Sequence, residues 1–268
     1  MAHQPRFDPE SHGAGPVNRS APLIHKWSRV LYEYNEGESC LPPPRSGAAS
    51  VVLKDKLYMF GGFGGGTGRL DDFYSFDFAT LTWEEVKPLG DEKPGCRENN
   101  GVVISGSSRT IILFGGYNGT QWLNDLWSFD ITTKRWTCIQ ESSDLSDVYA
   151  TDETSAAVGM PTAAEGPPVG DEGLEGLTQN STHISRKRPC CRFGYLSLIH
   201  DNKLIVWGGF DGTKWLNDMY IFDFESLTWN EIRQLGTSPS RRSCPAWAKD
   251  EKCVYLHGGY DGVERKDE

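Results

Sequence analysis

Four short apolar runs, each ending in a pair of glycines, recur along the chain. They are LYMFGG at 57–62, IILFGG at 111–116, LIVWGG at 204–209 and VYLHGG at 254–259. Polar residues do not alternate within a run, so each run predicts a short strand that is buried on both faces. Glycine pairs suit places where φ is positive or where backbones crowd. Neither Lys-Ser/Thr nor a helix start follows them, so a structural role is favoured over a phosphate-binding loop.

Two further strand patterns follow three of the four glycine pairs. The first is an alternating run, typical of a half-covered strand, and the second is a short segment around a tryptophan. The alternating runs are DFYSFD at 72–77, DLWSFD at 125–130 and DMYIFD at 218–223, and the tryptophan segments are TWEEV at 82–86, RWTCI at 135–139 and TWNEI at 228–232. An Asp-x-x-Thr turn, as at Asp77 and Thr80, is expected before the last strand.

An arginine opens each of the four units, 16 to 18 residues before the first glycine of the pair. These residues are Arg45, Arg97, Arg192 and Arg242. Each complete unit therefore predicts four strands. A four-stranded sheet that is apolar on both faces must be sandwiched between similar sheets, which a radial ring of blades provides.

The repetition is close enough to define a building unit. Residues 114–130 and 207–223 are identical at 10 of 17 positions. The glycine pairs are 54, 93 and 50 residues apart. The interval of 93 fits a repeat of roughly 50 residues once an insertion of about 40 residues is placed near 140–191.

At these residues the chain resembles the kelch repeat family, through the glycine pair, the spaced aromatic and the later tryptophan. The resemblance implies an all-β fold, a β-propeller of four-stranded blades. Blades are expected at about 45–86, 97–139 and 192–232, with part of a fourth at 242–268. In kelch propellers an N-terminal strand often completes the last blade, and KWSRV at 26–30, with Trp27, resembles such a closing strand. The propeller is therefore expected to be incomplete, a fragment of a larger one spanning residues 25–268.

Two segments outside the repeats are expected to be disordered. Residues 1–24 form a polar leader without the apolar core of a secretory signal. Residues 140–191 are rich in Ser, Thr, Gly, Pro and acidic side chains and have few large apolar groups to offset the entropy of ordering. This insertion carries nine acidic residues and no Lys or Arg between Gln140 and Ser185, against a net charge of −10 for the chain. The acidity therefore belongs to one segment and not to the folded body.

Several function classes receive no support. No stretch approaches the apolar length of a membrane span, and no basic face with interleaved aromatics indicates nucleic-acid binding. The seven cysteines are odd in number and lack a C-x-x-C pair, which predicts neither a disulfide framework nor a zinc site. A reducing, cytoplasmic setting is favoured, with a nuclear or endomembrane-associated location left open.

Catalysis is not expected either. The copper oxidases similar to kelch proteins use two Tyr and two His, and the iron-dependent specifier proteins use a Glu-x-x-x-Asp-x-x-x-His motif that is absent here. Neither a Gly-x-Ser-x-Gly elbow nor a placeable carboxylate pair is present. No cofactor and no metal are expected. The alternative is a superfamily oxidase or lyase whose metal ligands lie in the missing blades.

Protein binding remains as the expected function, on the loops that follow the glycine pairs. Loops vary on a rigid scaffold and commonly carry function, and the resemblance implies a partner-binding face there. The candidate partner-binding residues are Arg69, Gln121, Lys214 and Arg265. The alternative interpretation of each is an ordinary solvated turn residue without a binding role. Trp122 and Trp215 are interpreted as packing residues. The Asn-Asp pairs at 124–125 and 217–218 are read as structural, satisfying backbone donors or a blade arginine.

The residues expected to be structural are those of the repeat itself: Gly61, Gly62, Trp83, Gly115, Gly116, Trp136, Gly208, Gly209, Trp229, Gly258 and Gly259. The three tryptophans are expected to be buried between blades. The partner is a protein that the sequence does not identify. By resemblance to kelch proteins that carry their blades first, such as the leucine-zipper-like regulators, the context is a substrate-receptor arm of a ubiquitin ligase.

Overall fold

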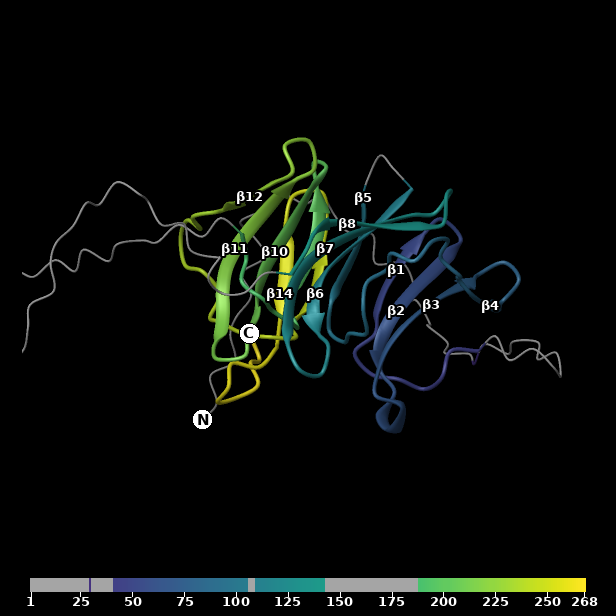
Figure 1. Cartoon of the computed structure of the whole chain (residues 1–268). Helices are drawn as coiled ribbons and strands as arrows, with labels where there is room; N and C mark the ends of the chain where they lie inside the picture. The colour runs from purple at the N-terminus through teal and green to yellow at the C-terminus, as the bar shows by residue number, and fades with distance from the viewer. Residues whose placement is uncertain (1–28, 30–40, 106–108, 143–187) are drawn as a thin grey trace, which may run out of the picture. The chain divides into compact units, whose positions relative to one another are not determined.

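A computed structural model describes residues 29, 41–105, 109–142 and 188–268 (Figure 1). The chain divides into two compact units, residues 1–32 and 33–268. Only Arg29 is described in the first unit, so the fold reported below is that of the second. The predicted leader, the closing strand at 26–30 apart from Arg29, and most of the acidic insertion lie outside the described residues.

Antiparallel strands make up almost all of the regular secondary structure in the described residues, in three four-stranded sheets and one two-stranded sheet. The single exception among the described helices and strands is a 3-10 turn, η1 (Gly65–Thr67). The first sheet holds β1 (Ala49–Leu53), β2 (Lys56–Phe63), β3 (Arg69–Asp77) and β4 (Thr82–Glu85). The second sheet holds β5 (Gly101–Ser105), β6 (Thr110–Tyr117), β7 (Trp122–Asp130) and β8 (Arg135–Gln140).

The third sheet holds β9 (Leu196–His200), β10 (Lys203–Phe210), β11 (Trp215–Asp223) and β12 (Thr228–Glu231). The fourth holds β13 (Ala246–Lys249) and β14 (Val254–His257). In each sheet the strands pair in chain order. The prediction of an all-β fold with three full blades and part of a fourth is therefore confirmed. In Figure 1 the four blades follow the colour bar from blue through teal and green to yellow.

The glycine pair is where the second strand of each blade bends. The register between β2 and β3 shifts between Phe60 and Gly62, and the same shift recurs in the next two blades. Gly61 and Gly62 have φ values of 64° and 103°. A Cβ atom on Gly61 would lie 2.5 Å from the carbonyl oxygen of Arg97 in the next blade. The pair thus supplies both the positive φ and the close approach between blades that only glycine allows.

The second and third blades each insert a tryptophan into the hydrophobic core that they share with the blade before them. Trp136 of β8 contacts Phe60 and Phe73 of the first blade, with ring centroids 5.6 Å apart in both cases. Trp229 of β12 contacts Phe114 of the second blade at 5.1 Å. Both tryptophans are buried, at 3% and 7% exposure.

Trp83 departs from the expected burial and is only half-buried. It packs on Phe76 of its own blade, with ring centroids 5.1 Å apart. The reason is positional: the tryptophans of the later blades are buried by the preceding blade, and no preceding blade lies within the described residues. Burial of this residue therefore depends on a neighbour and not on the repeat alone.

Candidate partner-binding face

One arginine in each blade holds the first glycine of the pair and the third strand together. In the second blade, Nη1 of Arg97 donates to the carbonyl oxygen of Gly115 at 3.1 Å. Its Nη1 and Nη2 donate to the two carboxylate oxygens of Asp125 at 2.7 and 2.8 Å. The equivalent pairs in the other blades are Arg45–Asp72, Arg192–Asp218 and Arg242–Glu268. In the first three blades this contact fixes the base of the loop between the second and third strands, and Glu268 takes the equivalent place in the fourth.

The same arginine joins its blade to the preceding one through the backbone. The Arg97 N–H donates to the carbonyl oxygen of Leu70, and its carbonyl oxygen accepts from the N–H of Gly62, at 3.0 and 2.8 Å. Two residues farther on, the N–H of Asn99 donates to the carbonyl oxygen of Gly47 at 2.8 Å. The next two junctions repeat all three bonds. Rigid joints of this kind hold neighbouring loops in a constant register.

A row of rings and guanidinium groups, called here the stacking row, lies at the base of the loops. In each blade the aromatic residue after the glycine pair lies across the ladder from a second large side chain. The stacking row consists of the pairs Phe63–Arg69, Tyr117–Trp122, Phe210–Trp215 and Tyr260–Arg265.

The stacking row crosses from one blade to the next. The Trp122 ring lies 4.9 Å from that of Tyr117 in its own blade and 6.2 Å from that of Phe210 in the next. A glycine makes room for it, because a Cβ on Gly212 would lie 2.7 Å from the Trp122 ring. Trp215 repeats this arrangement towards the fourth blade, with Tyr260 at 5.5 Å. Offset and edge contacts of this kind stabilise beyond the area that they bury.

Carboxylate and amide side chains shape the loops above the stacking row. The Oδ1 atom of Asn118 accepts hydrogen bonds from the N–H groups of Thr120 and Gln121, at 2.9 and 2.8 Å. Asp211 accepts from Thr213 and Lys214 at 2.9 and 2.8 Å. These are Asx turns, which pre-form the backbone of a loop. They leave the side chains at the loop tips exposed.

The structure places the four candidate binding residues in two different positions. Gln121 and Lys214 occupy equivalent exposed tips of the Asx-turn loops. Arg69 and Arg265 occupy the stacking row, at the positions held by Trp122 and Trp215 in the other blades. The tips are thus exposed, whereas the row positions lie closer to the joints between blades.

Arg69 is engaged within the chain. Its Nε donates to Oε1 of Glu98 at 3.0 Å. Its guanidinium lies 5.1 Å from the centre of the Phe63 ring and 4.7 Å from that of Tyr117. Sequence reasoning did not single out Glu98, because it lies 29 residues away in the next blade. The aromatic after every glycine pair was visible in the sequence and could have indicated the stacking row.

Comparison with known proteins identifies the repeat. The KLHDC2/KLHL20/DRC7 Kelch-repeats domain matches residues 24–166 and 173–267. The chain belongs to the kelch-repeat family. A leucine-zipper-like transcriptional regulator 1 homolog of Drosophila melanogaster is 28% identical over 246 residues, which is 91% of this chain and 21% of the relative. Human host cell factor 1 is 24% identical over 277 residues, covering 91% of this chain and 13% of the relative.

A third relative is matched over a smaller share of both chains. The dynein alpha chain of the flagellar outer arm of Chlamydomonas reinhardtii is 25% identical over 237 residues, which is 78% of this chain and 5% of the relative. The chain thus spans about a fifth or less of the length of these relatives.

Local hydrogen bonds and burial shift the pKa values of two side chains in the kelch blades. The side-chain hydrogen bond from Lys203, together with the N–H groups of Glu225 and Ser226, lowers the pKa of Asp223 to about 2. Burial raises the pKa of the Tyr195 hydroxyl. That hydroxyl accepts from the N–H of Gly101 at 2.6 Å and donates to the carbonyl oxygen of Phe114, so it ties the third blade to the second.

The described ranges contain neither a metal-binding cluster nor a membrane-spanning helix. No group of three or more His, Cys, Asp and Glu residues there is placed to hold a metal ion. No described helix is long and apolar enough to cross a membrane.

Proposed function

We propose that this kelch domain is a non-catalytic protein-interaction module, whose partner lies across the loops that follow the glycine pairs. One observation carries the proposal. Equivalent loops share the same Asx-turn backbone and the same aromatic base, yet they expose different side chains at their tips: Gln121, Lys214 and Glu264. A frame that is constant in backbone and variable in exposed chemistry is suited to recognition.

Rigidity supports the same proposal. Loops that are already ordered lose little conformational entropy when a partner binds. The backbone bonds at each junction and the stacking row keep neighbouring tips at fixed separations. From the family resemblance, the module serves as the substrate- or partner-binding part of an adaptor, with a ubiquitin-ligase context as the specific form of that proposal.

The test compares two double variants whose substitutions lie at opposite ends of the strands. The first is Gln121→Ala with Lys214→Ala, at the loop tips. The matched control is Thr133→Ala with Lys252→Ala, in hairpin turns at the opposite ends of the strands, where Asp130 and Asp250 form similar Asx turns. All four side chains are exposed and their backbone N–H groups keep their bonds, so stability should be unaffected.

The readout is quantitative co-purification from cells that express equal amounts of each protein. We expect the loop-tip variant to lose most of the proteins recovered with the wild type and the control variant to retain them. Loss with the control variant alone, or equal recovery with both, would reject the loop face as the binding surface. Binding constants for any purified partner should follow the same order.

A further inference from the structure

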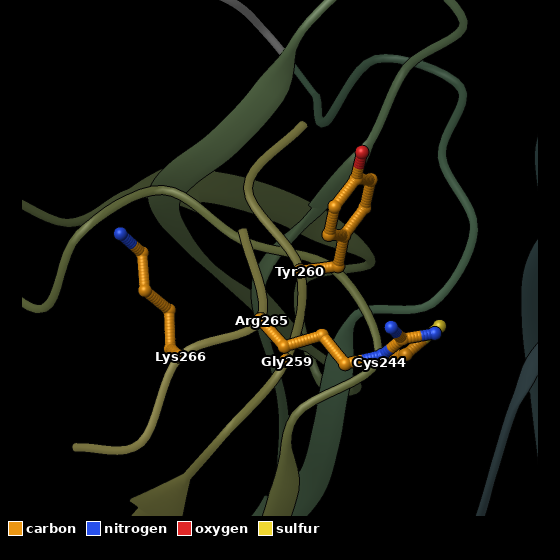
Figure 2. A pocket seen from close by; sticks show the side chains of 5 residues that line it. All are labelled: Cys244, Gly259, Tyr260, Arg265 and Lys266. Atoms are coloured by element: carbon orange, nitrogen blue, oxygen red, sulfur yellow. The ribbon is translucent and has the colours of Figure 1, made fainter. Parts of the chain in front are cut away.

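One position, three residues after each blade arginine, is built alike in the four blades but carries different side chains. The residues there are Ala48, Asn100, Tyr195 and Pro245. Each packs on the second glycine of the pair in its own blade. A Cβ on Gly116 would lie 2.9 Å from that of Asn100, and in the third blade a Cβ on Gly209 would lie 3.0 Å from that of Tyr195. Figure 2 shows Gly259, the glycine at this place in the fourth blade.

In the third blade this position seals the joint with the second blade, called here the second joint. The Tyr195 hydroxyl accepts from the N–H of Gly101 at 2.6 Å and donates to the carbonyl oxygen of Phe114. Gly101 leaves room for it, because a Cβ there would lie 2.7 Å from the hydroxyl oxygen. The polar group of this buried side chain is therefore fully hydrogen-bonded.

In the second blade the same position places an unpaired amide in the joint with the first blade, called here the first joint. Asn100 is 9% exposed, and neither its Nδ2 nor its Oδ1 has a hydrogen-bond partner among the described residues. Ala49 stands in the first blade where Gly101 stands in the second. Its Cβ takes the space that the Tyr195 hydroxyl uses beside Gly101, so the first joint has no room for a tyrosine.

The blade tryptophans show the same contrast between the two joints. The indole N–H of Trp229 donates to Oε1 of Gln140 across the second joint, at 2.7 Å. Trp136 is the equivalent residue at the first joint and is 3% exposed, yet its indole N–H has no partner within the described ranges. Lys87 stands there in place of Gln140, four residues after the tryptophan of its blade. Its ammonium group can donate a hydrogen bond but cannot accept one.

The two joints are alike in their backbone contacts. Three hydrogen bonds of 2.8 to 3.1 Å between backbone groups cross each of them. The second joint has one unpaired group of its own, the indole N–H of Trp122, which belongs to the partly exposed stacking row. At the first joint, the unpaired atoms of Asn100 and Trp136 belong to side chains that are more than nine-tenths buried. The difference between the joints therefore lies in their buried side chains.

We propose that the first joint is a hinge, at which the first blade separates from the second by local opening more readily than the second separates from the third. Opening lets water reach the amide of Asn100 and the indole of Trp136, which relieves the cost of burying them unpaired. The loop tips of Gln121 and Lys214 lie on the two blades of the second joint, so this opening leaves them in place. The inference does not depend on partner binding at those tips.

Residue-resolved hydrogen exchange of the full chain tests the hinge through the amides that cross each joint. Those of Gly62, Arg97 and Asn99 cross the first joint, and those of Gly116, Arg192 and Gly194 cross the second. The first set should exchange roughly tenfold faster or more, because each unpaired buried group costs about fivefold or more. Two triple variants exchange the residues of the joints. The first joint receives Ala49→Gly, Lys87→Gln and Asn100→Tyr, and the second joint receives Gly101→Ala, Gln140→Lys and Tyr195→Asn.

The exchanged residues separate the proposed cause from the place of the first blade in the chain. The first variant should slow exchange at the first joint alone, and the second should speed it at the second joint alone. Equal exchange at both joints in the wild type, or variants that leave the difference unchanged, would overturn the proposal. Lys87→Gln alone, a change of one exposed side chain, provides a test that does not risk the fold. It should slow exchange at the first joint about fivefold, whereas Lys87→Leu, which offers no acceptor, should not; equal effects of the two would also overturn the proposal.

Discussion

Asp125 of the second blade binds the buried Arg97. Replacing it with alanine should destabilise the protein more than replacing Glu268, the equivalent residue of the fourth blade. The Arg97 and Asp125 side chains are 2% and 10% exposed. Asp125→Ala would leave the Arg97 guanidinium without its counter-charge and would also remove the acceptor of the Trp127 indole N–H. Breaking one partner of a buried pair costs about 3–5 kcal/mol. We expect a loss of this size in the free energy of unfolding.

The repeats supply the graded controls for this prediction. Asp218 and Asp72 make the same contact at 19% and 21% exposure, whereas Glu268 makes it at 68% exposure. Although the Arg242 side chain is 1% exposed, water screens the attraction of so exposed a carboxylate. The loss should therefore be largest for Asp125→Ala, intermediate for Asp218→Ala and Asp72→Ala, and smallest for Glu268→Ala.

The assay is equilibrium urea unfolding followed by tryptophan fluorescence. Midpoints are compared between variants with equal m-values, which separates stability from changes in compactness. If Asp125→Ala loses no more stability than Glu268→Ala, the arginine contact is not what holds the blade. Asp125→Asn, which keeps the shape of the side chain and removes its charge, would then show whether packing accounts for the remainder.

Further predictions concern packing and pH. Trp136→Ala should lower the free energy of unfolding by about 3–5 kcal/mol, because the ring is buried against the first blade. Trp83→Ala should lower it less, because that ring is half-exposed. Urea midpoints of the two variants test the difference. Gly212→Ala should lower the melting temperature, because its φ is 99° and its Cβ would meet the Trp122 ring, and adding Trp122→Leu should recover part of the loss. The lowered pKa of Asp223, about 2, means that its contribution to stability is complete above the unfolded value and is lost as the pH falls from about 4 towards 2. Asp223→Asn should flatten the pH dependence of the urea midpoint in that window, and an unchanged slope would contradict this.

The fold was predictable because the same sequence pattern recurs several times along the chain. The glycine pair, the alternating run and the late tryptophan recur in register, and each has a local physical meaning. The interactions between blades were harder to predict. The half-exposure of Trp83 depends on which blade precedes it. The pairing of Arg69 with Glu98 depends on the register between two sheets, which no local pattern encodes.

The candidate site shows the same division. Gln121 and Lys214 were recognisable as loop residues, and the structure places them at exposed tips. Arg69 looked similar in sequence, yet it occupies the stacking row, because it lies opposite Phe63 in the ladder as Trp122 lies opposite Tyr117. Side chains that cross between repeats can be assigned only once the repeats are placed side by side.

Hydrogen exchange on a complex with a partner recovered by the loop-tip comparison tests the proposed function most directly. Partner binding should slow exchange in the loops at 117–122 and 210–215. The hairpin turns at 131–134 and 224–227, at the opposite ends of the same strands, should exchange as in the free chain. Protection confined to those turns, with unchanged exchange in both loops, would contradict the proposal that this kelch domain binds its partner through the loops after the glycine pairs.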